Sequence, residues 1–243
     1  MNIFILTGSG ISADSGLKTF RDDETGIWAG EYLLHVCTLG AFEHNPSRVN
    51  DFYNKRREEV DAHKPNAAHY AIAEYMAKTE NNVMLVTQNV DNYHEIAAGN
   101  PFSVFKMHGD LYRLFCIKCG DYFNVGKGYQ HDIESECSNC GETKTIRPDV
   151  VFFGEQIQLD LPKVQKFLKK DADGNRLSHF ISIGTSGVVY PAAEFVKQAH
   201  FNSKKVYINL DLKDVHHLYN EKVTGLAKDT VPDYFKKLYK EYG

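Results

Sequence analysis

A chain of 243 residues can hold one large α/β domain with a lesser appended module, but not two full-sized domains of independent function. Its 42% apolar and 25% charged residues are typical of globular proteins and exclude disorder, fibres and low-complexity arrays. The formal net charge of -4 gives no electrostatic reason to bind nucleic acid or an anionic membrane, so we expect neither partner.

The chain opens with an apolar run over residues 2–6, which is too short to cross a membrane and lacks the features of a secretory signal. We expect it to form the first strand. The cysteine pattern, with four of five cysteines in pairs, favours a reducing, cytoplasmic location. The fifth, Cys37, has no local partner and is expected to be a small buried residue without a redox role.

Short apolar runs rich in β-branched residues recur along the chain, separated mostly by segments with helical character. They span residues 3–7, 83–87, 104–107, 180–184 and 206–210. This alternation predicts an α/β fold, a Rossmann-like doubly wound parallel sheet. Ligands bind such sheets at the carboxyl ends of the strands, and four of the five runs end there in a polar cluster.

Two stretches interrupt the alternation. Residues 26–64 have helical periodicity, and residues 112–146 hold all the paired cysteines. We expect these insertions to form a smaller module, a zinc ribbon with helices, within a single catalytic unit over residues 1–243. The Rossmann-like core then comprises the remainder of the chain, residues 1–25, 65–111 and 147–243.

Gly8 and Gly10 follow the first strand and precede an expected helix. This arrangement can bring backbone N–H groups and a helix N-terminus toward a phosphate, although the same turn also serves plain strand-to-helix packing. The turn departs from the dehydrogenase fingerprint, because Ala13 stands at its third position and no acidic residue closes a second strand about 20 positions later. Hydride transfer is therefore disfavoured.

The paired cysteines are Cys116, Cys119, Cys137 and Cys140. The 17 residues between the two Cys-x-x-Cys pairs match the spacing of a tetrahedral four-cysteine zinc site. Two disulfides or a redox pair are the alternatives, and a reducing compartment disfavours them. Four thiolates leave no open coordination position, so we expect the Zn²⁺ to be structural. No basic patch with interleaved aromatics flanks the pairs, which argues against a nucleic-acid ribbon.

Six motifs resemble, in order and spacing, those of the sirtuin family, and together they cover nearly the whole chain. They are residues 8–21, 87–94 and 108–109, the two cysteine pairs, and residues 147–155 and 184–186. Ser9 stands where the family usually has alanine, Lys18 replaces a frequent proline, and Tyr93 replaces a frequent leucine. None of these departures removes a group that the chemistry needs.

The resemblance implies that NAD lies across the strand ends as a consumed co-substrate. The residues that it assigns to the phosphates and the neighbouring ribose are Gly8, Ser9, Gly10 and Arg21, with Trp28 also counted in the site. Those assigned to the nicotinamide end are Gln88, Asn89, Val90 and Asp91. Those assigned to the adenosine end are Gly184, Thr185, Ser186, Asn209, Leu210, Asp211 and Ala227. By residue type alone, Asn89 and Asp91 could equally cap the next helix.

The resemblance gives catalytic roles to His108 and Asn89. Histidine can take up a proton near neutral pH, although a lone histidine is more often structural and His94 is an equally plausible candidate by residue type. In the implied reaction, the acyl oxygen attacks the nicotinamide ribose and releases nicotinamide. His108 then deprotonates a ribose hydroxyl, which attacks the resulting imidate. Water completes the transfer, and the products are free lysine and O-acyl-ADP-ribose.

Residues 150–155 and 187–190 resemble the two edges between which the family clamps an extended substrate peptide, an arrangement that gives affinity with little sequence demand. The residues expected to contact the peptide are Val151, Phe153, Gly154 and Val188. Each segment alone could equally be an ordinary strand or a helix entry.

Tyr53 and Arg56 lie at positions i and i+3 and share a helix face. They resemble the tyrosine and arginine of sirtuins that prefer acidic acyl groups such as succinyl and malonyl, and a guanidinium fork suits a carboxylate. From spacing alone, Arg56 could belong to a solvated helix face. The acidic residues 22–24 could also repel an acidic acyl group if they point inward.

The sequence therefore favours an NAD-dependent lysine deacylase, formally a transferase, and we expect deacetylase activity together with desuccinylase or demalonylase activity. Two alternatives differ in class. One is an NAD glycohydrolase or ADP-ribosyltransferase on the same scaffold, and the other is a zinc-ribbon sensor without catalytic activity. The expected peptide clamp favours the deacylase over the first, and the presence of His108 and Asn89 argues against the second.

Overall fold

A six-stranded parallel sheet forms the base of the molecule in this computed structural model, which describes residues 1–19, 33–100, 104–169, 176–187, 190–212 and 217–243. The strand order is β3-β2-β1-β7-β8-β9. The strands are β1 (Asn2–Thr7), β2 (Asn82–Thr87), β3 (Val104–Lys106), β7 (Leu177–Ile183), β8 (Lys204–Asn209) and β9 (Glu221–Thr224). The five apolar runs of the sequence thus form strands, and the doubly wound parallel sheet is confirmed.

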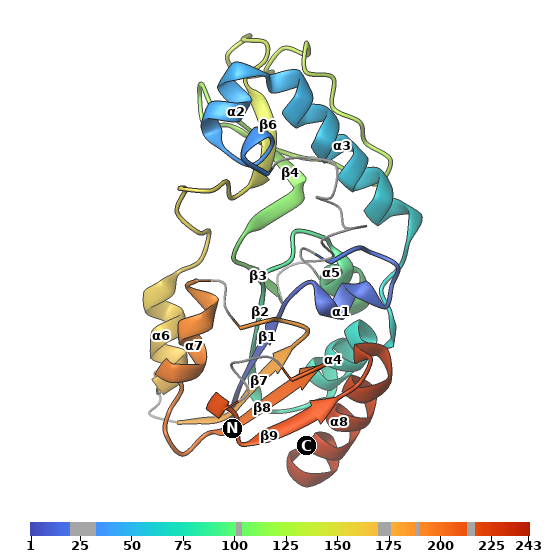
Figure 1. Ribbon diagram of the computed structural model, residues 1–243, viewed down its shortest axis with the longest axis vertical. Coiled ribbons are helices and arrows are strands. Elements are labelled where there is room, and N and C mark those ends of the chain that lie inside the picture. The colour runs from blue at the N-terminus through green and yellow to red at the C-terminus, as the bar shows by residue number, and fades with distance from the viewer. Residues whose placement is uncertain (20–32, 101–103, 170–175, 188–189, 213–216) are drawn as a thin grey trace.

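Helices cover both faces of this sheet (Figure 1). Helices α4 (Ala67–Lys78) and α8 (Ala227–Tyr242) lie on one face, and α6 (Leu161–Lys169) and α7 (Ala192–Gln198) lie on the other. Alternate side chains of β1 point to opposite faces, so that Ile3 and Ile5 join the core under α4 and α8, whereas Phe4 joins the core under α6 and α7. Burial on both faces explains the continuous apolar run.

The strand β9 has no counterpart among the predicted runs. It pairs with β8 at the edge of the sheet, and its residues alternate between half-buried and exposed. An edge strand with only one partner needs little apolar surface, so the segment carries no long hydrophobic signal.

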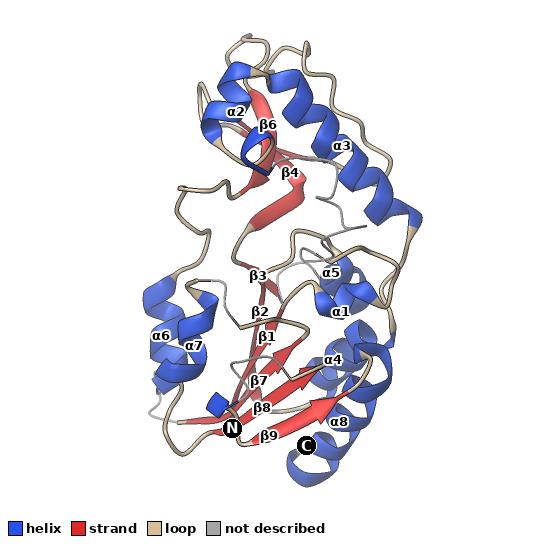
Figure 2. Cartoon of the chain, viewed as in Figure 1, coloured by secondary structure: helices blue, strands red, loops and turns tan. Residues whose placement is uncertain are grey.

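A second unit stands above the carboxyl ends of the parallel strands (Figure 2). It contains an antiparallel sheet of order β5-β4-β6, built from β4 (Gly109–Cys116), β5 (Tyr122–Asn124) and β6 (Ile146–Val150). The described part of residues 26–64 adds η1 (Leu33–His35), α2 (Leu39–His44) and α3 (Pro46–Ala62), which bears out the helical periodicity. The expected domain boundaries at 111/112 and 146/147 fall inside β4 and β6, and the division into two domains remains a prediction.

The long helix α3 begins with two local signals. Pro46 occupies the first turn, and the side chain of Asn45 accepts a hydrogen bond from the N–H of Arg48 at 3.0 Å. Its apolar face, including Val49, Phe52 and Tyr53, packs in one core with β4 and the segment after β6. This packing holds α3 over the strand ends of the large sheet.

The order of the parallel strands reverses between β1 and β7, which are neighbours although far apart in sequence. In doubly wound sheets this reversal opens the crevice in which ligands bind. Two short helices lie near this crevice. Helix α1 (Gly10–Ala13) follows β1, and helix α5 (Tyr93–Ala98) follows the segment after β2. The architecture thus places the polar strand-end clusters at one edge.

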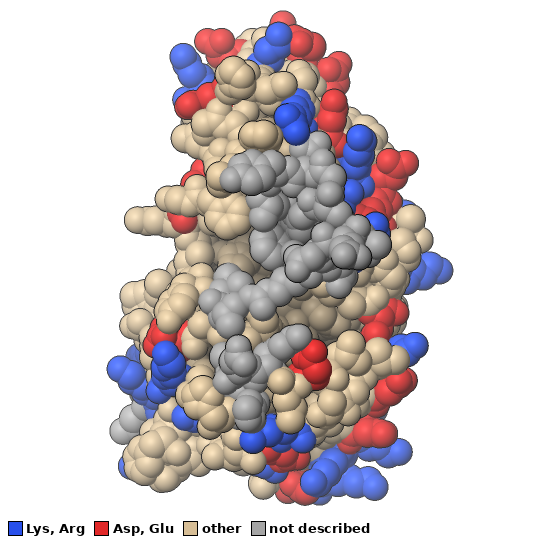
Figure 3. Space-filling model, viewed as in Figure 1, with Lys and Arg blue, Asp and Glu red and all other residues tan. Residues whose placement is uncertain are grey.

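Basic and acidic side chains are interspersed on the face of the molecule that Figure 3 shows. This agrees with the small net charge of -4. Among the described residues, no helix combines the length and the apolar character that a membrane span requires.

Candidate active site

The glycine turn after β1 packs directly against the turn after β7. A Cβ atom on Gly10 would lie 2.8 Å from the Cα of Gly184, and one on Gly8 would lie 2.8 Å from the Cβ of Thr185. The amides of Gly8 and Gly10 donate to the carbonyls of Ile183 and Gly184, at 3.0 and 2.8 Å. These glycines therefore permit close packing at the strand reversal, and their two amides already bind protein carbonyls.

The helix expected after this turn is short. It is α1, with four residues, so the turn does not lead into a long helix whose N-terminus could attract a phosphate. Ser9 precedes it and is half-buried. The phosphate assignments of Gly8, Ser9 and Gly10 consequently rest on the resemblance and not on a helix dipole.

Thr185 joins three of the strand ends. Its hydroxyl accepts a hydrogen bond from Gln88 Nε2 at 2.9 Å, and its carbonyl accepts one from Asn209 Nδ2 at 3.1 Å. The next residue, Ser186, is half-buried. The structure thus brings together residues assigned to both ends of NAD around the crevice between β1 and β7.

Asn89 and Asp91 meet at the hydroxyl of Ser12. Asn89 Nδ2 lies 3.2 Å from Ser12 Oγ and donates to the carbonyl of Gly8 at 3.2 Å, and Ser12 Oγ donates to Asp91 Oδ2 at 3.0 Å. Asp91 Oδ1 also accepts the N–H of Tyr93 at 3.1 Å. One oxygen of Asp91 therefore binds the N–H of the first residue of α5, just before which Asn92 is the N-cap, while its second oxygen accepts from Ser12.

Ser12 and His69 are two members of this cluster that the sequence did not single out. His69 is fully buried on α4, and its Nε2 lies 3.4 Å from Ser12 Oγ. Burial lowers the pKa of His69 to about 4, against the opposing charge of Asp91, so its ring is neutral near neutral pH. Ser12 lies within the first motif, but nothing local marks His69, because its contact with Ser12 spans 57 residues.

His108 and His94, the two candidate bases, have different environments. His108 is half-buried, and its Nδ1 donates to the carbonyl oxygen of Gln88 at 2.8 Å. Because a carbonyl only accepts, this bond assigns the proton to Nδ1 and leaves the lone pair on Nε2. His94 is buried, with Nε2 3.0 Å from Thr7 Oγ1. The hydrogen bond thus leaves Nε2 of His108 without a proton, whereas Nε2 of His94 is engaged by Thr7.

Burial also lowers the pKa of both histidines, but to a different extent. It lowers the pKa of His108, although the Gln88 carbonyl opposes this shift. It lowers the pKa of His94 well below the ordinary value, and the nearby His69 and Lys106 add to the effect. His94 is therefore held neutral inside the protein, whereas the side chain of His108 stays partly exposed.

The remaining cofactor assignments differ in their exposure. Leu210 is 63% exposed and Asp211 is exposed, whereas Ala227 is buried at the start of α8. The carbonyl of Val90 accepts a hydrogen bond from the N–H of Leu111 at 3.1 Å, which links this segment to β4. Three assigned residues lie outside the described part of the chain, namely Arg21, Trp28 and Val188, as do residues 22–24.

The segment after β6 turns away from the strand. Val151 N donates to the carbonyl of His108 at 2.9 Å, and Phe153 N donates to the carbonyl of Cys37 at 2.8 Å. Gly154 has a φ of 90°, a conformation that favours glycine, and Phe153 is 54% exposed. The strand ends at Val150, so the alternative of an ordinary strand through 155 is wrong, and this irregular edge lies directly beside His108.

Tyr53 and Arg56 lie on α3 with different partners. Tyr53 is buried, its hydroxyl lies 3.3 Å from Cys37 Sγ, and its ring stacks on Phe152. Arg56 pairs with Glu59 at 2.8 Å, and its side chain is 22% exposed. Arg56 is therefore not on a fully solvated face.

Cys37 and Tyr53 are both neutral in this setting. Burial raises the pKa of the Cys37 thiol to about 11, against the Tyr53 hydrogen bond, and burial also raises the pKa of Tyr53 well above its ordinary value. A neutral, buried thiol is a poor nucleophile, which agrees with the expected absence of a redox role.

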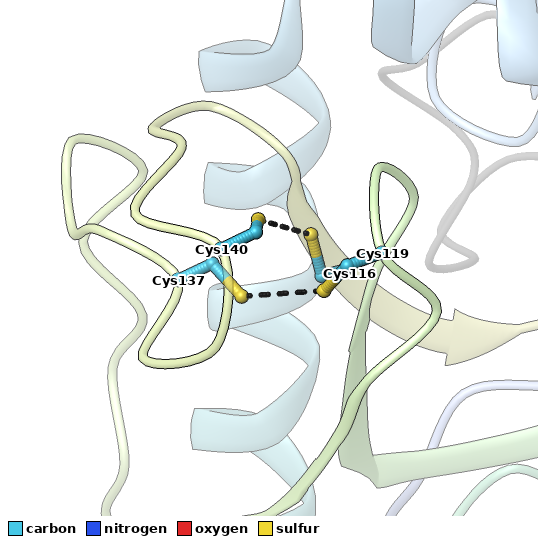
Figure 4. Close-up of side chains that lie close together, drawn as sticks. All are labelled: Cys116, Cys119, Cys137 and Cys140. Carbon is cyan, nitrogen blue, oxygen red and sulfur yellow. Dashed lines mark hydrogen bonds between the residues drawn. The ribbon is translucent and has the colours of Figure 1, made fainter.

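The paired cysteines come together as the spacing predicted (Figure 4). Their sulfur atoms all lie within 4.8 Å of one another, with Cys116 and Cys140 3.8 Å apart and Cys119 and Cys137 3.7 Å apart. Sulfurs around a Zn²⁺ with Zn–S bonds of about 2.3 Å lie about 3.8 Å apart, whereas bonded sulfurs are about 2.0 Å apart. The four cysteines are unpaired as disulfides and are positioned to bind a structural zinc.

Comparison with known proteins agrees with this geometry. The model of the Sir2 family matches residues 8–191. The chain is 41% identical to an NAD-dependent protein deacylase of Pasteurella multocida (strain Pm70), in a match that covers 96% of each chain.

Solved structures are similar over the whole chain. A Sir2 homolog in complex with NAD is 30% identical with a TM-score of 0.83, covering 100% of this chain and 91% of that one. A mutant Sir2 homologue in complex with 2'-O-acetyl ADP ribose is 30% identical with a TM-score of 0.85, in a match that covers 100% of this chain and 93% of that one. The family match over most of the chain, the fold and the four-cysteine cluster agree. This chain belongs to the Sir2 family of enzymes, the sirtuins.

Proposed function

We propose that this chain removes acyl groups from protein lysines in a reaction that consumes NAD, and that acidic acyl groups such as succinyl and malonyl are among its substrates. The main support for the general reaction is that Gln88 binds both Thr185 and His108, so that residues from three strand ends lie together at one crevice. The relative from Pasteurella is an NAD-dependent protein deacylase, which supports the same reaction here.

NAD supplies the ribose to which the acyl group is transferred. In the proposed site, Asn89 and Asp91 orient the nicotinamide end of NAD, because both side chains are held by Ser12 beside the β1 turn. The hydrogen-bond network around Thr185, which includes Gln88 and Asn209, positions the rest of the NAD molecule. Fixed polar groups of this kind reduce the entropy that is lost when the reacting atoms meet.

His108 is the proposed general base. Its Nδ1 is committed to the Gln88 carbonyl, so that Nε2 is free to take a proton from a ribose hydroxyl. The lowered pKa keeps the imidazole neutral, as a base must be, near neutral pH. The proposed products are the free lysine, nicotinamide and O-acyl-ADP-ribose, and the complex of a homologue with 2'-O-acetyl ADP ribose supports the last of them.

The acyl-lysine would enter beside the irregular edge after β6. Val151 N already binds the carbonyl of His108, and the exposed Phe153 provides apolar surface next to it. An extended peptide could pair with backbone groups here, and such pairing makes little demand on the peptide sequence.

The proposal that acidic acyl groups are substrates rests on Arg56. Its Nε is buried and has no hydrogen-bond partner within the described part of the chain. An unpaired buried donor is unfavourable, and a terminal acyl carboxylate would satisfy it. Glu59 already neutralises part of the guanidinium charge, so an incoming carboxylate would have to compete with it.

Mass spectrometry of acetyl-, succinyl- and malonyl-lysine peptides, with and without NAD, tests the proposal on the wild type and on Arg56→Met. We expect NAD-dependent loss of all three groups from the wild type. The variant should lose most succinyl and malonyl removal, while acetyl removal survives. Deacetylation alone in the wild type would contradict the acidic acyl preference, and steady nicotinamide release without deacylation would indicate an NAD glycohydrolase.

A further inference from the structure

One face of α3 is bonded along its length to the segment between the two cysteine pairs. The four polar residues Asn50, Asn54, Arg57 and Asp61 are spaced by four, three and four positions, and therefore form a single stripe along the helix. We name them the α3 stripe. Residues 128–131, which we name the strap, lie opposite it.

The upper half of the stripe binds one residue of the strap from both sides. Asn50 Nδ2 and Asn54 Nδ2 donate to the carbonyl of His131, at 2.8 and 2.9 Å. The N–H of His131 donates back to Asn54 Oδ1 at 2.9 Å. Asn50 and His131 are both almost fully buried, so the bond between them is shielded from water, whereas the two bonds of Asn54 are partly buried.

The lower half continues the same contact. Arg57 Nε donates to the carbonyl of Tyr129 and Nη1 to the carbonyl of Leu111, both at 3.2 Å, and Nη2 donates to Asn54 Oδ1. Asp61 accepts the N–H of Gly128 at 2.6 Å. Arg57 has no exposed surface, so its guanidinium is a fully enclosed link between the helix, the strap and β4.

The neighbouring arginine behaves differently. Arg56 is partly exposed and has a buried Nε without a described partner, whereas the donors of Arg57 are used within the fold. Arg56 is therefore available to a ligand, whereas Arg57 holds the helix in place. Tyr53 and Arg56 stand directly beside Asn54 and Arg57 in the sequence, so the stripe anchors the turns of α3 that carry them.

We infer that Asn54 and Arg57 are positioning residues for acyl selection, which hold α3 against the strap so that Tyr53 and Arg56 stand at the correct place for an acyl carboxylate. This inference rests on the proposed preference for acidic acyl groups. Acyl selection is then a joint property of α3 and of the segment between the zinc ligands. Misplacement of a positioning group by about 1 Å can cost about 100-fold in rate.

The test compares kcat and KM for succinyl- and acetyl-lysine peptides in the wild type, Arg57→Met, Asn54→Ala and the control Lys55→Met. Lys55 belongs to the same charged run but is exposed, so its variant removes a charge without touching the strap. We expect both stripe variants to lose at least about tenfold in kcat/KM for the succinyl peptide, through KM, and less than about threefold for the acetyl peptide. Lys55→Met should match the wild type.

A binding measurement without turnover gives a second readout. Fluorescence polarisation with a labelled succinyl peptide and no NAD should show weaker binding to the stripe variants and unchanged binding to Lys55→Met. Asn54→Ala keeps the inference testable if Arg57→Met does not fold, because Asn54 is only half-buried.

The outcomes separate the inference from the proposed function. If the wild type removes both acyl groups and the stripe variants lose both equally or neither, the inference is overturned while the function stands. If the wild type removes acetyl but not succinyl, the acidic acyl preference fails and the inference fails with it. A selective loss of succinyl removal supports both.

Discussion

The Nδ1 of His108 and the carbonyl oxygen of Gln88 are joined by a hydrogen bond of 2.8 Å that links the end of β3 to the end of β2. This bond fixes the tautomer of the imidazole and directs Nε2 away from the Gln88 carbonyl. The same carbonyl opposes the effect of burial on the pKa of His108, and burial prevails. The hydrogen bond thus sets the position and the tautomer of the proposed base, whereas burial sets the direction of its pKa shift.

The acid side of the pH–rate profile should report His108. A protonated imidazole cannot accept a proton, so kcat/KM should fall tenfold per pH unit below the pKa of the free enzyme's base. Because burial lowers that pKa, the midpoint should lie below the ordinary value of 6.5. The measurement is kcat/KM for an acetyl-lysine peptide across the acid range, and a midpoint at or above 6.5 would contradict the assignment.

Replacement of the base should reduce turnover without loss of the fold. We expect His108→Ala to lower kcat about 10²- to 10⁴-fold, the usual contribution of a general base. His44→Ala is a suitable control, since His44 is exposed on α2. Thermal unfolding of both variants should resemble that of the wild type, and full activity of His108→Ala would exclude this histidine as the base.

Zinc removal should unfold the ribbon. Among the described residues, the apolar core around the cysteines has four buried members, of which two are the expected ligands Cys116 and Cys137. A core of this size cannot replace a metal that contributes folding free energy directly. We expect one zinc per chain, a lower melting temperature with a chelator, and loss of zinc in Cys140→Ser but not in Cys37→Ser. A melting temperature unchanged by the chelator would argue against a structural metal.

The buried histidine of α4 should make stability depend on pH. The pKa of His69 is about 4 in the folded protein, against an ordinary value of 6.5, so the unfolded chain binds more protons between these values. Stability should therefore fall as the pH drops from 6.5 toward 4, by about 1.4 kcal/mol per pH unit for this one group. Urea unfolding of wild type and His69→Gln at several pH values measures it. An identical slope in the two proteins would rule out this contribution of His69.

The close approach of the β1 and β7 turns should make Gly10 sensitive to substitution. A Cβ at this position meets the backbone of Gly184 at 2.8 Å, whereas a Cβ on Gly40 of α2 meets nothing within 4 Å. We expect Gly10→Ala to destabilise the protein by about 1 to 3 kcal/mol and to weaken NAD binding. Gly40→Ala should be neutral or stabilising by up to about 1 kcal/mol. Denaturant unfolding and NAD titration distinguish the two, and equal behaviour would show that the turns can separate freely.

The sequence predicted the elements whose signals are local. Strands such as β1 are buried on both faces, so their apolar residues are consecutive and visible. The edge strand β9 and the short strand β5 alternate between exposed and half-buried residues, and neither was predicted. Their stability comes from pairing with strands elsewhere in the chain, which the local pattern does not record.

The candidate site divides in the same way. The sequence by itself determined the zinc ligands, because two Cys-x-x-Cys turns carry their spacing with them, and it determined which strand ends are polar. Only the tertiary structure decided that His108 and not His94 is the accessible histidine and that Ser12 joins Asn89 to Asp91. It also decided that Arg57 is enclosed, while Arg56 Nε has no hydrogen-bond partner among the described residues. These distinctions depend on burial and on partners dozens of residues away, and a residue's type and its neighbours in sequence do not specify either.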